Sequence, residues 1–284
     1  MLNHSCCQDQ IRKGICFRLT GFSSRMAGVL RPPSPAIVTT LARAYMYEIA
    51  PATRALLYSF TVTYISMFLY SGTEESGKNF FADVDNPFNQ YLVKWAWGWT
   101  LALVSLHHLV QPGPWDFSKE GLGKACRLAM GHMVWYLGAR LAFPWFEEAT
   151  GVCKASHLTS RRACYKGNSI WTGFDTSGHC FLLTFNNLLI SEETAESRKG
   201  KLEMIQKKTN GDGDNKQQEG EEEQPFAWSR LLLCLLMLVW DVMIICTSLY
   251  FHTFLEKVLG TACGVGAWYL LYRVLYPLIR AAIS

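Results

Sequence analysis

The stretch from Trp228 to Phe251, WSRLLLCLLMLVWDVMIICTSLYF, determines the class of fold that we expect for this chain. Its only charged residues are Arg230 and Asp241. A helix needs about 20 largely apolar residues to cross a lipid bilayer, so this stretch predicts a membrane-spanning helix. A second stretch, from Val258 to Ile279, carries the single charge of Arg273 and predicts another.

Further apolar segments raise the expected number of spans to six. Half of the residues are hydrophobic and 18% are charged, a composition that suits a polytopic helical bundle. Residues 1–30 contain basic residues but no continuous apolar core, so we expect no cleaved secretory signal. The sequence therefore predicts an all-α, polytopic membrane protein with six transmembrane helices. The additional spans are 52–70, 91–110, 125–146 and a shorter one at about 177–190.

The distribution of lysine and arginine predicts the orientation, because cytosolic loops are enriched in these residues. Lysine and arginine occur in the N-terminal tail and in the 111–124 and 193–227 loops, whereas the 71–90 loop has four acidic residues and the single basic residue Lys78. The 147–176 loop is also basic, but an even number of spans places it on the far side, where we interpret its charge as serving an anionic ligand. The expected organisation is a basic cytosolic tail (1–50), the first four spans with a lumenal loop at 147–176 (51–192), a flexible cytosolic linker (193–227), and the last two spans with a short cytosolic C-terminus (228–284).

The linker is expected from its composition. From about Ser197 to Glu223 the chain is rich in Gly, Gln, Glu and Lys and has no apolar periodicity. Such a segment cannot bury enough apolar surface to fold alone. A docking or regulatory role toward cytosolic partners is the alternative interpretation.

Cys153 and Cys164 flank a polar part of the 147–176 loop, on the expected non-cytosolic side. An oxidising lumen would permit a disulfide between them, and the sequence leaves a bridge and two free thiols equally open. The other eight cysteines show no Cys-x-x-Cys spacing and are expected to be small buried residues.

Polar residues inside the spans indicate the chemistry, since they are costly in hydrocarbon and usually face the interior of a bundle. His179 begins the fourth span and His252 ends the fifth, with Glu256 four residues further on if that helix continues. Both histidines fall on the same side of the membrane, which indicates phosphoryl chemistry. Further polar residues at helical spacing are expected to converge on the same pocket: Lys94, His132, Tyr136, Arg140, Asn186, Asp241 and Ser248.

A histidine at the end of a span also has a simpler interpretation, as an interface residue that hydrogen-bonds a headgroup or a backbone carbonyl. For His179 and His252 the sequence leaves both interpretations open. His107 and His108, at an expected cytosolic end, are interpreted as interfacial. No His or Cys set has ligand spacing such as H-x-x-x-H, so we expect no metal site.

Three segments carry a family resemblance. They are Val93–Thr100 (VKWAWGWT), Trp171–Phe185 (WTGFDTSGHCFLLTF), and Tyr250-Phe-His252 followed by Lys257-Val-Leu-Gly260. Together with Trp268-Tyr269 through Tyr276-Pro277, they resemble the fat storage-inducing transmembrane protein family. The resemblance covers about residues 88–278 without the linker, and the Phe-Asp-x-Ser-Gly-His form is closer to the second type of that family.

The resemblance implies a six-spanning protein of the endoplasmic reticulum membrane, related to the lipid phosphatases, with its active site facing the lumen and both termini in the cytosol. It also implies hydrolysis of fatty acyl-CoA to acyl 4′-phosphopantetheine and adenosine 3′,5′-bisphosphate, in support of lipid droplet formation and lipid homeostasis. We expect no cofactor and no nucleic-acid partner.

In lipid phosphatases a Pro-Ser-Gly-His motif supplies an acid histidine, and a Ser-Arg-x5-His-x3-Asp motif supplies the nucleophile and its carboxylate. Ser177-Gly178-His179 matches the first motif, with Thr176 in place of proline, and His252-x3-Glu256 matches the end of the second. The resemblance thus implies His252 as nucleophile, Glu256 as the carboxylate that orients it, and His179 as acid. Ser177 and Gly178 would contact the substrate.

Two features of those phosphatases are missing from this chain. The arginine of the His-x3-Asp motif falls at Cys246, and there is no Lys-x6-Arg-Pro motif. A diphosphate still needs cations or fixed N–H donors. The substitutes that we expect at the substrate are Arg140, Lys94, Lys166 and Lys257, although Arg140 could instead pair with Asp241.

The competing hypothesis is a non-enzymatic protein whose polar pocket binds diacylglycerol or triacylglycerol and partitions neutral lipid into droplets. The missing arginines favour it, whereas two histidines with a carboxylate four residues on favour the enzyme. A transporter is less well supported, because the chain lacks the internal repeat of many transporter folds.

Overall fold

The computed structural model describes residues 35–69, 80–110, 119–155, 159–209 and 223–283. Within these ranges the chain is mostly helical, as the all-α prediction requires, and it has a single two-stranded antiparallel sheet. The chain divides into two compact units, residues 1–41 and residues 42–284. The helical bundle described below belongs to the second unit.

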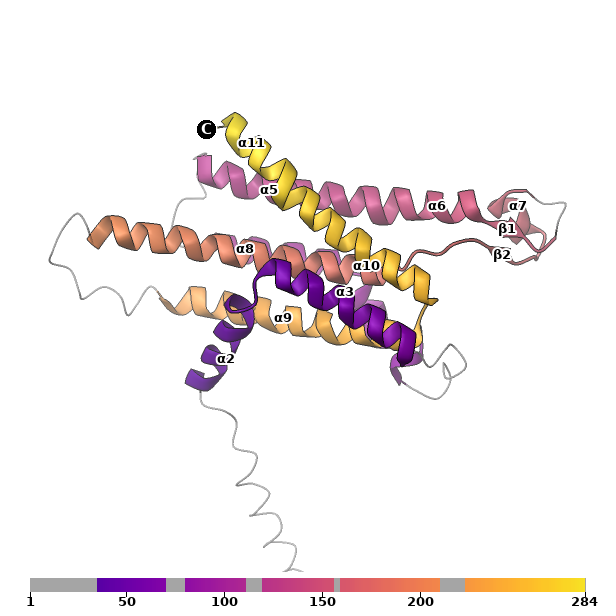
Figure 1. Cartoon of the computed structure of the whole chain (residues 1–284), viewed down its shortest axis with the longest axis horizontal. Coiled ribbons are helices and arrows are strands. Elements are labelled where there is room, and N and C mark those ends of the chain that lie inside the picture. Colours follow the sequence, from indigo (N-terminus) through magenta and orange to yellow (C-terminus); the bar gives the residue numbers. More distant parts are fainter. Residues whose placement is uncertain (1–34, 70–79, 111–118, 156–158, 210–222, 284) are drawn as a thin grey trace, which may run out of the picture. The chain divides into compact units, whose positions relative to one another are not determined.

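The elements follow one another along the chain as labelled in Figure 1. They are α2 (Pro35–Tyr47), α3 (Pro51–Phe68), η2 (Phe80–Ala82), η3 (Phe88–Val93), α4 (Ala96–Leu109), α5 (Lys119–Trp135), η4 (Tyr136–Ala142), α6 (Phe143–Thr150), β1 (Val152–Cys153), α7 (Arg161–Lys166), β2 (Trp171–Thr172), α8 (Gly178–Thr209), α9 (Glu223–Tyr250), α10 (Phe254–Tyr269), η5 (Leu270–Leu275) and α11 (Tyr276–Ile283).

The helices follow the apolar segments of the sequence. The 52–70 segment forms α3, and the 125–146 segment forms the continuous run of α5, η4 and α6. The 91–110 segment is interrupted, because the π-helix η3 ends at Val93 and α4 begins at Ala96. Among the described residues, two helices are long and apolar enough to cross a membrane by length and composition, Trp228–Tyr250 and Phe254–Ala281.

The flexible linker expected over 193–227 is helical at both of its ends. Helix α8 continues without a break to Thr209, and α9 already begins at Glu223. Residues 193–209 and 223–227 are therefore helical, while residues 210–222 lie outside the described part of the chain. Glu, Lys and Arg are good helix formers, and the buried first half of α8 provides the nucleus from which they extend the helix.

Helix α8 is the central helix of the bundle. It contacts α3, α4, α9 and α10 (Figure 1), and every residue from Cys180 to Ser191 is buried. A helix that is surrounded on all sides is expected to be largely apolar all round. Its polar exceptions, Thr184, Asn186 and Asn187, therefore lie inside the protein and not against lipid.

Helix α10 approaches α8 closely because glycines face the contact. A Cβ on Gly260 would lie 2.4 Å from the carbonyl oxygen of Ser177, and a Cβ on Gly264 would lie 2.7 Å from that of Phe181. Small residues four apart let membrane helices pack backbone to backbone. This contact fixes α10 against the first turns of α8, which carry the Ser-Gly-His motif.

Large apolar side chains are exposed on the outer face of α3. Leu56, Phe60 and Met67 are each at least 65% exposed, whereas Val62 on the inner face is fully buried. A soluble monomer rarely exposes a contiguous apolar face of this kind. Hydrocarbon solvates such a face, so the surface of α3 suits a lipid bilayer.

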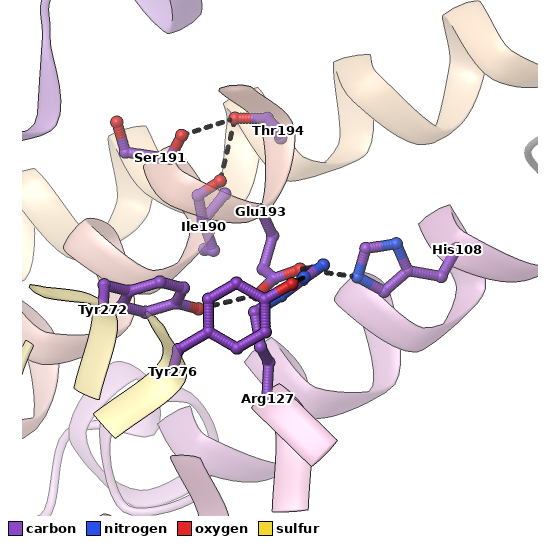
Figure 2. Close-up of polar contacts among 8 residues, drawn as sticks. All are labelled: His108, Arg127, Ile190, Ser191, Glu193, Thr194, Tyr272 and Tyr276. Carbon is purple, nitrogen blue, oxygen red and sulfur yellow. Dashed lines mark hydrogen bonds and ion pairs between the residues drawn. The ribbon is translucent and has the colours of Figure 1, made fainter. Parts of the chain in front are cut away.

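About four turns after His179, a buried carboxylate ties α8 to three other elements (Figure 2). Glu193 accepts hydrogen bonds from Arg127 Nε of α5 at 2.8 Å and from the Tyr272 hydroxyl of η5 at 2.7 Å. Its other oxygen lies 2.9 Å from His108 Nε2 of α4. A buried charge persists only when it is paired and hydrogen-bonded, so this cluster stabilises the end of the bundle remote from His179.

The interfacial interpretation of His107 and His108 is wrong, because both side chains lie inside the bundle. Their exposed fractions are 0% and 1%. His107 Nδ1 lies 2.9 Å from Ser229 Oγ of α9, and His108 faces Glu193. These partners come from distant parts of the chain, so the local sequence around the histidines did not reveal them.

Candidate active site

His252 lies at a bend between two helices. Helix α9 ends at Tyr250 and α10 begins at Phe254, so the continuous helix considered for Asp241 to Glu256 is broken. The backbone of His252 has a φ of 57°. Non-glycine residues rarely adopt this left-handed conformation, and strained positions of this kind cluster at functional sites. The imidazole is 20% exposed, so solvent reaches this bend.

Glu256 caps the helix that follows the bend. The N–H of Thr253 donates to Glu256 Oε2 at 2.7 Å, while the Thr253 side chain accepts a hydrogen bond from the backbone of Glu256. This reciprocal arrangement is a capping box. The same Oε2 lies 3.7 Å from His252 Nδ1. Glu256 therefore has a structural role in addition to its contact with His252.

His179 lies in the first turn of α8, next to open space. A Cβ added to Gly178 would meet no atom within 4 Å. Ser177 is fully buried, and its Oγ accepts a hydrogen bond from Cys180 N–H at 3.3 Å, which caps the helix. The first N–H groups of a helix and its dipole attract anions. The start of α8 thus combines a histidine with a setting that suits a phosphate group.

The two histidine motifs are joined directly. The N–H of Ser177 donates to the carbonyl oxygen of Glu256 at 3.1 Å, and Gly260 packs against the same residue, Ser177. His179 and His252 lie within range of electrostatic interaction with each other. The structure therefore brings together the two histidines singled out from the sequence.

A second carboxylate approaches His252, and the sequence analysis did not assign it a role. Asp175 Oδ2 lies 3.6 Å from His252 Nδ1, the nitrogen that also faces Glu256. Asp175 has no helical spacing to His252, so periodicity could not have linked them. The available signal was an acidic residue just before the Ser-Gly-His motif.

The candidate cations differ in their surroundings. Lys94 is exposed, its Nζ donates to Gln90 Oε1 at 2.7 Å, and it lies within electrostatic range of His179. Lys257 is fully buried, and its Nζ donates to the carbonyl oxygen of Ser248 at 2.8 Å. The structure thus brings Lys94 toward the histidines, whereas it holds Lys257 inside the protein.

Arg140 and Lys166 are both exposed. Gly138 of η4 faces α8, because a Cβ there would lie 2.8 Å from the ring of Phe181. Residues two apart on a helix do not share a face, so Arg140 lies on a different face of η4 from Gly138. Lys166 ends α7, on the loop before β2. Within the described ranges, neither residue makes a hydrogen bond or an ion pair with His179 or His252.

The alternative pairing of Arg140 with Asp241 is wrong. Asp241 accepts hydrogen bonds from the Tyr45 hydroxyl, the Tyr58 hydroxyl (2.8 Å) and the Asn187 amide (2.8 Å), and makes no ion pair with Arg140 in the described part of the chain. Asp241 is about three turns before His252 on α9. It therefore belongs to a separate polar cluster, which corrects the expectation that all polar residues of the spans converge on one pocket.

The side chains of His132 and Ser248 also have hydrogen-bond partners outside the expected pocket. His132 Nδ1 accepts a hydrogen bond from the Trp97 indole N–H at 3.0 Å, and the Ser248 hydroxyl donates to the carbonyl oxygen of Ile244 at 2.8 Å. Both contacts are local to the packing of the helices. They satisfy polar groups that the sequence analysis had assigned to the pocket.

A disulfide-linked hairpin leads into the site. A disulfide joins Cys153 to Cys164, the pair named from the sequence, and β1 pairs with β2 in antiparallel register. After β2, the N–H of Phe174 donates to Thr150 Oγ1 at 3.0 Å. The segment that carries Asp175 and the Ser-Gly-His motif is thereby anchored to the end of α6.

The structure is a helical bundle in which a Ser-Gly-His segment contacts a His-x3-Glu segment. These features define a class of helical proteins whose paired histidines suit phosphoryl chemistry. The sequence comparisons agree with this class. The model of the fat storage-inducing transmembrane protein family matches residues 77–272, and the chain belongs to this family. It is therefore an integral membrane protein.

Individual relatives cover most of the chain. It is 36% identical to acyl-coenzyme A diphosphatase FITM2 of Xenopus tropicalis, over 67% of this chain and 70% of the relative. It is 31% identical to the protein of the same name in Danio rerio, over 70% of this chain and 75% of the relative. It is 32% identical to fat storage-inducing transmembrane protein 1 of Homo sapiens, over 70% of this chain and 66% of the relative. No solved structure matches the chain.

Proposed function

We infer that this chain is a fatty acyl-CoA diphosphatase, which hydrolyses acyl-CoA to acyl 4′-phosphopantetheine and adenosine 3′,5′-bisphosphate. The observation that carries the inference is the direct link between the histidine motifs, the hydrogen bond from Ser177 N–H to the Glu256 carbonyl oxygen at 3.1 Å. Cleavage of a diphosphate by covalent catalysis needs a nucleophile and a proton donor at one phosphorus. Relatives named acyl-coenzyme A diphosphatase support the same reaction.

In the first step His252 is the nucleophile. Both carboxylates face Nδ1, which leaves Nε2 for attack. Nε2 forms a bond to one phosphorus of the diphosphate while the bond from that phosphorus to the bridging oxygen breaks. With the anionic diphosphate bound beside it, His179 carries a proton and gives it to the departing oxygen, an effect that contributes about 10²–10⁴-fold to the rate.

In the second step water releases the phosphohistidine. His179, now neutral, accepts a proton from a water molecule as its oxygen attacks the phosphorus. The bond from phosphorus to Nε2 breaks, so His252 returns to its neutral form and His179 to its protonated form. The net reaction consumes one water and produces two phosphate monoesters.

The negative charge of the diphosphate is met by groups at the start of α8 and by a lysine. The first N–H groups of α8 serve as fixed donors beside Gly178, where space is open. Lys94 adds a positive charge near His179. Fixed donors stabilise the charge that develops in the transition state, so these groups compensate for the missing arginines.

The same proposal includes the membrane topology. The six spans are α3, then η3 with α4, then α5 with η4 and α6, then α8, α9, and α10 with η5 and α11. Two of them pass a length and composition test for spanning helices. The active site faces the lumen of the endoplasmic reticulum, and both termini lie in the cytosol. The disulfide between Cys153 and Cys164 supports an oxidising compartment for the 147–176 loop.

The acyl chain remains in the bilayer while the coenzyme A part stays in water. This division explains why an enzyme for an amphiphilic substrate is built into a membrane. Removal of acyl-CoA at this site supports lipid droplet formation and lipid homeostasis.

The second hypothesis is a non-enzymatic protein that binds diacylglycerol or triacylglycerol. The presence of Cys246 in place of an arginine favours it. It predicts lipid binding without turnover, and binding that is unchanged when His252 is replaced.

The test uses purified, detergent-solubilised protein with oleoyl-CoA, and it measures release of adenosine 3′,5′-bisphosphate. We expect turnover by the wild type and none by His179→Ala or His252→Ala, because each removes a group that acts on the reacting phosphorus. His4→Ala, in the tail outside the described residues, serves as the matched histidine control. Near-normal turnover by either active-site variant would overturn the assignment, and an inactive, folded wild type would overturn the function.

A further inference from the structure

We propose that Asp175 positions His252 and stabilises the positive charge on its imidazole during attack, an inference that rests on the proposed diphosphatase function. Asp175 Oδ2 lies 3.6 Å from His252 Nδ1. When Nε2 bonds to phosphorus, the ring becomes positive and keeps its proton on Nδ1. A carboxylate at that nitrogen fixes the tautomer and stabilises the charge. Such contacts are often long in the free enzyme and shorten in the reacting complex.

Asp175 suits this role better than Glu256, because the Glu256 carboxylate also accepts a backbone hydrogen bond. Glu256 Oε2 already accepts the Thr253 N–H at 2.7 Å, as part of the cap of α10. Asp175 makes no hydrogen bond through its carboxylate among the described residues. An imidazolium at His252 therefore faces two carboxylates. The Glu256 carboxylate also caps α10, whereas the Asp175 carboxylate does not take part in a helix cap.

The backbone around Asp175 is held on both sides, although its side chain is 61% exposed. The Phe174 N–H donates to Thr150 Oγ1 at 3.0 Å, and the Ser177 N–H donates to the Glu256 carbonyl oxygen at 3.1 Å. The Phe174 ring also packs edge-on against Phe146 at 5.6 Å between centroids. These contacts define where the carboxylate can reach, which distinguishes Asp175 from an ordinary surface acid.

The negative charge of Asp175 would weaken the binding of a diphosphate if it had no positive partner. Among the described residues, the carboxylates of Asp175 and Glu256 face His252, His179 acts on it electrostatically, and Lys94 acts electrostatically on His179. A purely repulsive role for Asp175 thus makes the opposite prediction from a positioning role. Its removal would then lower KM and leave kcat unchanged.

The kinetic test compares Asp175→Asn and Asp175→Glu with Glu148→Gln, which removes an exposed carboxylate from the neighbouring helix α6. We expect Asp175→Asn to lower kcat for release of adenosine 3′,5′-bisphosphate by roughly ten- to a hundredfold with KM little changed. This loss is smaller than that for a buried triad aspartate, because Asp175 is solvated. Asp175→Glu should recover part of kcat, and Glu148→Gln should match the wild type. An unchanged kcat, or a lower KM alone, for Asp175→Asn would overturn the proposal.

A second readout does not depend on turnover. Diethyl pyrocarbonate modifies neutral imidazole, and mass spectrometry of the His252 peptide follows the reaction at this residue alone. A carboxylate that faces Nδ1 stabilises positive charge on the ring, and a positively charged ring does not react, so Asp175→Asn should speed modification of His252. An equal rate in Asp175→Asn and wild type would overturn the contact even if the wild type is an active diphosphatase. If the wild type has no diphosphatase activity but His252 is modified faster in Asp175→Asn, the proposed function fails and the contact between Asp175 and His252 is still supported.

Discussion

At the scale of residues, the proposed diphosphate site lacks the arginine that the lipid phosphatase motif would place at residue 246. Cys246 occupies the position of that arginine and is 8% exposed. Lys257 is fully buried and donates a hydrogen bond to the carbonyl oxygen of Ser248 at 2.8 Å. Lys94 is the candidate cation that is both exposed and within electrostatic range of His179.

Replacement of Lys94 should therefore reduce activity more than replacement of Arg140. We expect Lys94→Gln to lower kcat/KM by about ten- to a hundredfold, because it removes a donor and a charge from the phosphate. Lys94→Arg should keep most of the activity, since the charge remains although its geometry changes. The measurement is steady-state hydrolysis of oleoyl-CoA by Lys94→Gln, Lys94→Arg and Arg140→Gln. A larger loss for Arg140→Gln than for Lys94→Gln would assign the phosphate contact to Arg140 instead.

At the scale of elements, the crossing of α10 over α8 determines the distance between the two histidine motifs. Gly260 and Gly264 face the carbonyl oxygens of Ser177 and Phe181. The backbone of one helix thus serves as the packing surface of the other. The capping box then fixes the first turn of α10 and, with it, the bend at His252.

A methyl group at this crossing should separate the motifs. In Gly260→Ala the new Cβ would lie 2.4 Å from the Ser177 carbonyl oxygen, a distance that forces the helices apart. We expect diphosphatase activity to fall at least about tenfold and the free energy of unfolding to fall by about 1–3 kcal/mol.

The matched control is Gly266→Ala, on the same helix, where a Cβ would meet nothing within 4 Å. Alanine has the higher helix propensity, so this variant should be as stable as the wild type or slightly more stable. Thermal unfolding in detergent and the oleoyl-CoA assay compare the two variants. Equal activity and stability in both would mean that the crossing does not control the site.

At the scale of the whole molecule, two parts of α8 have different roles. The first turn carries His179 after the disulfide-linked hairpin, and the middle of the helix carries the buried Glu193 cluster. The proposed topology assigns the hairpin to the lumen and the continuation of α8 beyond Glu193 to the cytosol. The basic 147–176 loop is an exception to the usual charge rule, so its location needs a direct test.

Engineered glycosylation sites provide that test. An Asn-x-Ser/Thr acceptor placed within 153–166 should be modified in the endoplasmic reticulum, because the loop is expected in the lumen. An acceptor placed within 205–220 should remain unmodified, because this segment is expected in the cytosol. A shift in gel mobility that is reversed by endoglycosidase reports modification. Modification of the 205–220 acceptor would place both histidines in the cytosol and contradict the lumenal site.

The sequence alone determined the helices and the motifs, because both are local properties. The apolar run Trp228–Phe251 became a helix that ends at Tyr250, within one residue of the prediction. Local composition was less informative for 193–209, because a helix nucleated by the buried part of α8 continues into residues that could not fold alone. Thr253-x-x-Glu256 is a capping-box signature, whereas the His252-x3-Glu256 spacing predicts only a catalytic role for Glu256.

Only the tertiary structure decided which polar groups meet. The contacts of Asp175 with His252 and of His108 with Glu193 join residues far apart in the chain. Helical periodicity gives the face on which a residue lies, but the partner across that face depends on which helices cross and how closely. Here the glycines of α10 determine that closeness, and a backbone hydrogen bond from Ser177 to Glu256 brings the two histidine motifs into one site.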